Sequence, residues 1–160
     1  MPQIDEHLKW CLKDPKRLIK TKSDLDLAQK HVKKSEYNYG VVQTLERLKI
    51  YDWAFNVGFY AIYHCFLAIL AKYGYESRNQ ACTITVLLTL INDNKLDLDK
   101  DLVTQFDTLD VEKSIASPTV RESREISTYG VETSIDLQQL KKIKELILKV
   151  QRETIRILGE

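Results

Sequence analysis

Apolar residues recur every three or four positions along much of the chain, the spacing that places side chains on one face of an α-helix. The clearest case is the C-terminal segment, where a helix is expected to start near Asp136. Its mostly apolar stripe comprises Leu140, Ile143, Ile147, Val150, Thr154 and Ile157. This pattern predicts an amphipathic helix with one face in the core.

Two helices are expected in the first half of the chain. One begins at Ser23 or Asp24, either of which suits an N-cap, and continues to Tyr39. The next runs from Gly40 to Tyr73 and ends at Gly74, which suits a left-handed cap. The positions that approximate one face of this second helix are Leu45, Leu48, Trp53, Val57, Tyr60, His64, Leu67 and Ala71.

Polar start signals predict the remaining helices. Ser77 and Gln80 fit a capping box, S-x-x-Q, before the helix "ACTITVLLTLI", which closes near residues 92–94. A shorter helix covers "DKDLVTQFDTL", and Ser117-Pro118 precedes a helix through "VRESREISTY". With no confident strand, these five to six helices predict an all-α, antiparallel helical bundle. Residues 1–160 are expected to form one domain, with residues 1–22 as an N-terminal extension that packs on the bundle.

The balance of charge narrows the classes of partner. The 160 residues carry 24 basic and 23 acidic side chains, for a net charge of +1. This excludes a uniformly basic nucleic-acid coat but leaves room for a local basic patch. The basic stretch "KDPKRLIKTK", from Lys13 to Lys22, is one such place.

The segment from Trp53 to Ala71 has no charged residue and is close to the length of a membrane span. Asn56 and His64 lie inside it, however, and their polar atoms need partners. A helix buried in the bundle or at a dimer interface is therefore expected, and no membrane.

The cysteines and the N-terminus bear on the compartment. Cys11, Cys65 and Cys82 are odd in number and widely spaced, and Cys11 and Cys82 are not obvious partners. Free thiols in a reducing cytoplasm are the simplest interpretation. The start "MPQIDEHLKWCLK" has no apolar signal core, which also favours a cytoplasmic location.

No established cofactor or metal motif is present. The sequence has no phosphate-binding glycine loop, no H-E-x-x-H and no C-x-x-C. His7, His31 and His64 are far apart in sequence and fall on different predicted elements. Neither a metal nor a cofactor is therefore expected.

Two groups of residues could bind an anion. Arg78 and Asn79 stand at a predicted helix N-terminus, where anions bind readily. Arg121 and Arg124 share a helix face, followed by Tyr129, and paired guanidinium groups suit phosphate. Salt bridges, such as Arg121 with Glu125, are the simpler explanation of the second pair. A lone His64 on an apolar face is, in the same way, usually a core histidine.

The central segment "WAFNVGFYAIYHCFLAILAKYGYESRNQACTI" resembles HEPN domains (higher eukaryotes and prokaryotes nucleotide-binding). The match is closest to small stand-alone archaeal and bacterial members, which have a Tyr- and Ala-rich helix ending in His, a Gly-bounded turn and a second helix. "RESREISTYG" resembles their Arg-rich, Tyr-ending helix, and "WCLK" resembles related archaeal proteins near the start. The residues that match the first helix and the turn are Phe59, Tyr60, Ala61, Tyr63, His64 and Gly74.

The resemblance implies a bundle of four or five helices, commonly a homodimer, that partners a minimal nucleotidyltransferase in toxin–antitoxin pairs. Active members are metal-independent ribonucleases, in which His transfers protons and Arg stabilises charge on phosphate. In this chain no Arg is followed by a His at the family's spacing, and Thr128 and Tyr129 occupy the expected His region. Gln80 stands where relatives often have a His.

Three hypotheses follow from the resemblance. The first is a module that binds RNA, a nucleotide or a nucleotidyltransferase partner through Arg78, Asn79, Arg121, Arg124 and Tyr129. It would dimerise through its apolar central helices. The second is a metal-independent ribonuclease toxin with a variant site, in which Arg121 and Arg124 hold phosphate while Tyr129 or His64 handles protons. The third is a purely structural dimer or adaptor.

Overall fold

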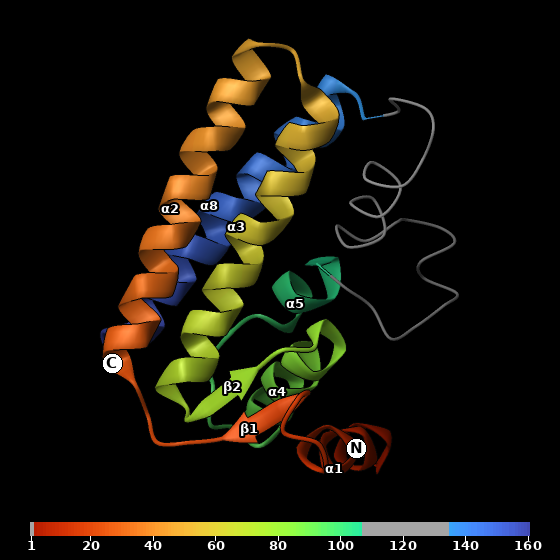
Figure 1. Ribbon diagram of the computed structural model, residues 1–160, viewed down its shortest axis with the longest axis vertical. Helices are drawn as coiled ribbons and strands as arrows, with labels where there is room; N and C mark the ends of the chain where they lie inside the picture. The colour runs from red at the N-terminus through yellow and green to blue at the C-terminus, as the bar shows by residue number, and fades with distance from the viewer. Residues whose placement is uncertain (1, 107–134) are drawn as a thin grey trace.

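Three long helices lie side by side along the longest dimension of the molecule (Figure 1). They are α2 (Leu25–Arg47), α3 (Tyr51–Lys72) and α8 (Leu137–Leu158). The described residues also form three shorter helices. Helices α1 (Pro2–Leu12) and α4 (Gln80–Asn92) lie at one end of the bundle, and α5 (Lys100–Phe106) lies beside α3. This computed structural model describes residues 2–106 and 135–160. The predicted all-α helical bundle is confirmed.

One two-stranded sheet accompanies the helices. Strands β1 (Leu18–Lys20) and β2 (Tyr75–Ser77) pair antiparallel, with Ile19 opposite Glu76. The sheet lies between α1 and the end of α3 (Figure 1). The sequence predicts no strand here, because three residues are too few to show an alternating pattern.

The boundary between α2 and α3 differs from the prediction. Asp24 does cap α2, its side chain accepting a hydrogen bond from the backbone N–H of Leu27 at 2.9 Å. The helix then passes through Gly40 without a break and turns at Lys49, which has φ 61°. The predicted boundary at Gly40 is wrong because Gly40 lies on the exposed face of α2. Packing of that helix against α3 outweighs the roughly 1 kcal/mol cost of an internal glycine.

Gly74 ends α3 as predicted. Its φ is 81°, and an added Cβ would stand 2.6 Å from the carbonyl oxygen of Thr21. The backbone N–H of Thr21 donates to the Gly74 carbonyl at 2.7 Å. A glycine is needed here both for the backbone conformation and for the close approach of the chain that leads into α2.

The cap of α4 is not the predicted one. Ser77 ends β2, and the helix begins at Gln80 with Asn79 as its N-cap. The predicted S-x-x-Q capping box is therefore wrong, because strand pairing holds Ser77 two residues ahead of the helix. The last helix starts as predicted, with a capping box between Asp136 and Gln139.

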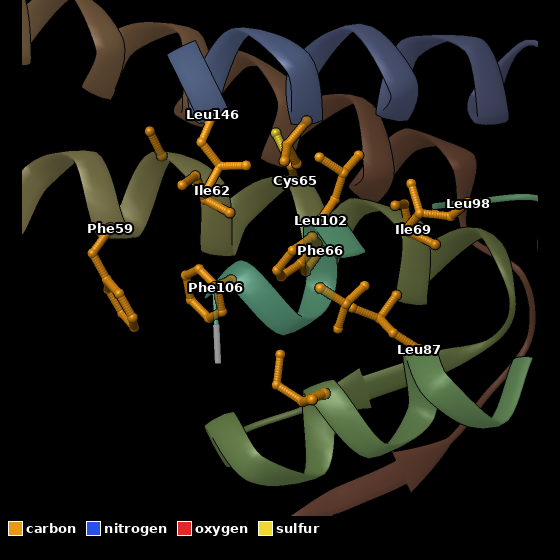
Figure 2. Close-up of a cluster of buried hydrophobic side chains, with 14 of the residues drawn as sticks. Phe59, Ile62, Cys65, Phe66, Ile69, Leu87, Leu98, Leu102, Phe106 and Leu146 are labelled. Atoms are coloured by element: carbon orange, nitrogen blue, oxygen red, sulfur yellow. The ribbon is translucent and has the colours of Figure 1, made fainter. Parts of the chain in front are cut away.

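Helix α3 forms the centre of the core (Figure 2). Phe59 stacks on Phe106 of α5 at 4.7 Å between ring centroids, and Phe66 meets the same ring edge-on at 5.1 Å. On another side α8 approaches closely at Gly58, where a Cβ would meet Ile143 Cδ1 at 3.2 Å. Since α3 is covered from several directions, it has no single buried stripe.

The structure confirms one of the two predicted apolar faces and contradicts the other. All six stripe positions of α8 are buried, which confirms that prediction. The face predicted for the Gly40–Tyr73 region is wrong, because Leu48 and Trp53 are 63% and 56% exposed. Buried residues occur around most of α3 instead.

Helix α3 is long and apolar enough to cross a membrane by length and composition. Within the bundle, however, 67% of its apolar window is buried. This burial is that of a core helix in a bundle, as the sequence analysis expects for Trp53–Ala71.

Candidate functional site

The predicted site residues fall into two groups. Arg121, Arg124 and Tyr129, with the helix predicted around them, lie outside the residues that the structure describes. His64, Arg78 and Asn79 are described. The candidate site is therefore built from these three and from the residues around them.

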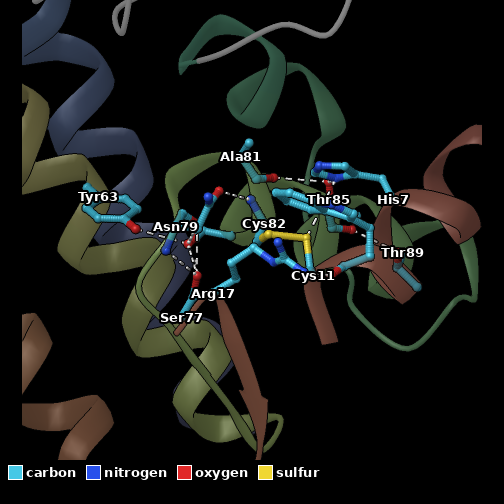
Figure 3. Close-up of a disulfide and its surroundings, with 12 residues drawn as sticks. His7, Cys11, Arg17, Tyr63, Ser77, Asn79, Ala81, Cys82, Thr85 and Thr89 are labelled. Atoms are coloured by element: carbon cyan, nitrogen blue, oxygen red, sulfur yellow. Dashed lines mark hydrogen bonds between the residues drawn. A yellow bond between two sulfur atoms is a disulfide. The ribbon is translucent and has the colours of Figure 1, made fainter. Parts of the chain in front are cut away.

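Asn79 has a structural task at the start of α4. Its side-chain oxygen accepts a hydrogen bond from the backbone N–H of Cys82 at 3.0 Å, which satisfies one free donor of the first turn. Ser77 donates to the Asn79 carbonyl at 2.9 Å and accepts from the Thr83 hydroxyl at 2.8 Å. Tyr63 of α3 reaches the same Thr83 hydroxyl at 3.1 Å. These contacts, drawn in Figure 3, account for Asn79 as a cap.

Arg78 lies beside the basic stretch seen in the sequence. Its backbone N–H donates to the Arg17 carbonyl at 3.0 Å, extending the β1–β2 pairing by one residue. The Arg17 guanidinium stacks over the ring of Trp10 at 3.7 Å and donates to the Trp10 carbonyl at 2.8 Å. Trp10 is still 45% exposed. We name the surface formed by these and the neighbouring exposed lysines the basic edge; it comprises Trp10, Lys13, Lys16, Arg17, Lys20 and Arg78.

In the basic edge, Trp10 contacts Arg17 and the backbone of Arg17 contacts that of Arg78, while Lys13, Lys16 and Lys20 are exposed neighbours of Arg17 in sequence. Asp14 and Glu76 are the acidic residues closest to it in sequence. An exposed aromatic ring next to several cations suits a ligand that has both planar rings and negative charges. The pairing of Arg78 with Arg17 could not be predicted, because the two strands that join them are too short to show in the sequence.

His64 forms a pair with His31. Their Nδ1 atoms are 2.9 Å apart, joining α3 to α2, and both side chains are half-buried. Burial, and to a smaller extent the neighbouring His31 and Lys34, together lower the pKa of His64 to about 4. Burial also lowers the pKa of His31. Both rings are thus neutral near pH 7, and one Nδ1–H donates to the other Nδ1.

A neutral pair is a poor proton donor at neutral pH, and the low pKa of His64 makes its ring a weak base as well. His31 and His64 lie on different predicted elements, and nothing in their spacing signals the contact. His64 therefore has a polar partner at the edge of the core, as is usual for a core histidine.

Cys65 is a buried free thiol. Burial raises its pKa to about 11, against the opposing effect of the Ser35 hydroxyl, 3.2 Å from the sulfur. Ser35 donates to the Ala61 carbonyl at 2.6 Å and accepts from the Gln151 amide at 3.0 Å. This group of buried polar atoms links α2, α3 and α8. An un-ionised, covered thiol of this kind is not a nucleophile.

Cys11 and Cys82 form a disulfide that joins α1 to α4 (Figure 3). The prediction of three free thiols is therefore wrong for these two residues. The 71 residues between them gave no sign of proximity, because packing of α1 on α4 is a tertiary contact with no local signature. His7 lies next to the disulfide, with its Nδ1 3.8 Å from Cys11 Sγ.

Comparisons with known proteins assign this chain to no family. No family model matches the sequence, and no curated protein is significantly similar to it.

Proposed function

We propose that this protein is a HEPN-like module that binds single-stranded RNA through its basic edge, as one half of a pair with a minimal nucleotidyltransferase. The observation that carries the proposal is the contact between Arg78 and Arg17 beside the exposed ring of Trp10. It places a residue chosen from the sequence for anion binding next to the basic stretch Lys13–Lys22.

Charge and exposure support this choice of ligand. Lys13, Lys16, Lys20 and Arg78 are exposed, so they are available to neutralise phosphates. The Trp10 ring already stacks with Arg17 at 3.7 Å and with His7 at 5.4 Å, so a base would take the place of one of these partners, and stacking of a base on an aromatic ring contributes about 1–3 kcal/mol. Because the whole chain has a net charge of only +1, this local group of cations attracts an RNA more strongly than the rest of the surface does.

A titration with a fluorescently labelled single-stranded RNA tests the proposal. Because each phosphate contact releases condensed counterions, log affinity should fall linearly with log salt, by about 0.7 per contact. Arg78→Ala should weaken binding about three- to tenfold and reduce the salt slope by about one contact. Arg152→Ala, which removes an exposed arginine from α8, is the matched control and should bind like the unsubstituted protein. Equal binding by Arg78→Ala and Arg152→Ala would exclude the basic edge.

The proposal includes a homodimer. The exposed apolar residues Leu48, Ile50 and Trp53 cluster at the turn between α2 and α3, with exposed fractions of 63%, 41% and 56%. A dimer that buries this turn would explain their character. Sedimentation equilibrium of Trp53→Glu should then show a monomer, and an unchanged mass would exclude this surface as the interface.

A metal-independent ribonuclease is the second candidate function. The observation that favours it is the close pair of imidazole rings formed by His31 and His64, although a pKa of about 4 makes His64 only a weak base near pH 7. Arg121, Arg124 and Tyr129 would complete this site. Metal-free cleavage of RNA that is lost in both His64→Asn and Arg124→Ala would support this function, and intact RNA at high protein concentration would exclude it.

The nucleotidyltransferase partner and the cytoplasmic location belong to the same proposal. Co-purification with a nucleotidyltransferase encoded next to this protein is the expected result. Recovery of the tagged protein alone, from cells that express both, would remove the paired-system part of the proposal.

A further inference from the structure

Three side chains with metal-binding atoms meet between α1 and α4, next to the basic edge, where His7 stacks on Trp10 at 5.4 Å between ring centroids. They are His7, Cys11 and Cys82, and their potential ligand atoms all lie within 4.8 Å of one another. We propose that reduction of the Cys11–Cys82 disulfide converts this cluster into a zinc site, with two thiolates and one imidazole as ligands.

The present distances are close to those that zinc requires. Tetrahedral zinc has Zn–S bonds of about 2.3 Å and Zn–N bonds of about 2.0–2.1 Å, so its ligand atoms stand roughly 3.5–3.8 Å apart. His7 Nδ1 is already 3.8 Å from Cys11 Sγ. Once the disulfide is reduced, the two sulfur atoms are no longer bonded and take a non-bonded separation of about 3.5–4.0 Å. Reduction alone therefore brings the sulfurs to the separation that the ion would impose.

The surroundings favour the charged form of at least one ligand. Cys82 lies in the first turn of α4, whose N-terminus stabilises a thiolate. The other two ligands, His7 and Cys11, come from α1, where they are four residues apart and so share a helix face. Two cysteines and one histidine form a donor set that zinc uses in proteins, and it leaves a fourth position open for water.

The hydrogen-bonding of His7 is compatible with this change. The Thr85 hydroxyl donates to the Ala81 carbonyl at 3.0 Å, so its oxygen is left to accept from His7 Nδ1–H at 2.6 Å. For zinc to bind at Nδ1, this proton moves to Nε2 and the His7 ring turns from the Thr85 hydroxyl towards the sulfur atoms, which ends the hydrogen bond with Thr85. The Thr85 hydroxyl keeps its hydrogen bond to Ala81, so the Thr85 donor retains its partner.

The conversion balances in electrons and protons. The disulfide takes two electrons and two protons from a dithiol, which itself becomes a disulfide, and leaves two cysteine thiols. Zinc binding then releases the two thiol protons. In an oxidising compartment the disulfide ties α1 to α4, and in a reducing one the ion would make the same link.

The test is zinc binding by the full chain in its two redox states. Protein kept oxidised, and protein reduced with a phosphine and then freed of it, are each equilibrated with zinc chloride and passed through a desalting column. Atomic emission should find about one zinc per reduced chain and essentially none per oxidised chain, because disulfide sulfurs do not ligate zinc. A reduced chain without zinc would overturn the proposal.

Variants assign the ligands. Cys65→Ser removes the buried cysteine outside the cluster and should leave one zinc per reduced chain, whereas Cys82→Ser should bind none. His7→Ala should weaken zinc binding at least about tenfold in competition with a chromophoric chelator. Zinc retained by Cys82→Ser, or lost from Cys65→Ser, would place the ion elsewhere and refute the assignment. Unchanged affinity in His7→Ala would remove His7 from the site. Circular dichroism of each reduced variant separates loss of a ligand from loss of the fold.

Discussion

The pair formed by His31 and His64 should make the stability of the protein depend on pH. The pKa of His64 is about 4 in the folded protein, against 6.5 for an ordinary histidine. The unfolded chain therefore binds a proton more readily than the folded one between these values. The sign follows directly: this contribution is fully present above about pH 6.5 and is lost as the pH falls towards 4.

The magnitude follows from the same two values. Each tenfold difference in proton affinity corresponds to about 1.4 kcal/mol, so a fully buried ring would lose about 3 kcal/mol over this range. Because the His64 ring is half-exposed and solvent screens part of the effect, we expect roughly half of this, about 1.5 kcal/mol. Protonation of carboxylates also destabilises the protein as the pH falls. Only a comparison with a variant that lacks His64 therefore isolates the contribution of this histidine to the free energy of unfolding.

The variant His64→Asn keeps a hydrogen-bonding group near the position of Nδ1 and does not titrate. Urea unfolding followed by circular dichroism, at several pH values from about 7 to 4, gives the free energy of unfolding of both proteins. The unsubstituted protein should lose about 1.5 kcal/mol more than His64→Asn over this range. Parallel curves for the two proteins would refute the neutral, desolvated pair and with it the argument that His64 cannot act as an acid at neutral pH.

Three further substitutions test the contacts that hold the candidate site. Under oxidising conditions Cys11→Ser should lower the free energy of unfolding by about 4 kcal/mol, because the disulfide closes a loop of 71 residues. Urea unfolding in the absence of zinc measures this change. A loss of less than about 1 kcal/mol would contradict the disulfide link. Gly74→Ala should cost about 1–3 kcal/mol, seen as a lower melting temperature, because of the φ of 81° and the Thr21 carbonyl 2.6 Å away; an unchanged melting temperature would contradict this geometry. Asn79→Ala should cost about 1 kcal/mol through loss of the cap and leave RNA affinity unchanged, whereas a matching loss of affinity would show that Asn79 also contacts the ligand.

The sequence was most informative where a helix has one buried side. Helix α8 was predicted with its start at Asp136 and all of its buried stripe, because solvent on one face imposes a clear period. Helix α3 was recognised as helical, but its buried face was not, because a helix covered on most sides has no such period. The break after α2 was misplaced for a related reason: Lys49 adopts a left-handed conformation that no local signal announces.

The candidate site was predicted only in part. Arg78 was singled out from its place before a helix, and this position is confirmed. Its neighbours Arg17 and Trp10, the contact between His31 and His64, and the Cys11–Cys82 disulfide were all missed. Each of these joins elements distant in sequence, and such contacts depend on how the helices pack, which a single sequence does not encode locally.

The most direct test of the central claim uses the two tryptophans of this chain, Trp10 and Trp53. Trp53→Phe leaves Trp10 on the basic edge as the only indole, and Trp10→Phe leaves Trp53 at the turn between α2 and α3. If RNA binds the basic edge, adding a single-stranded oligonucleotide should change the emission of Trp53→Phe in a saturable, salt-sensitive way. The emission of Trp10→Phe should stay the same. A saturable change confined to Trp10→Phe, or no change in Trp53→Phe at RNA concentrations that saturate binding, would contradict the proposed function.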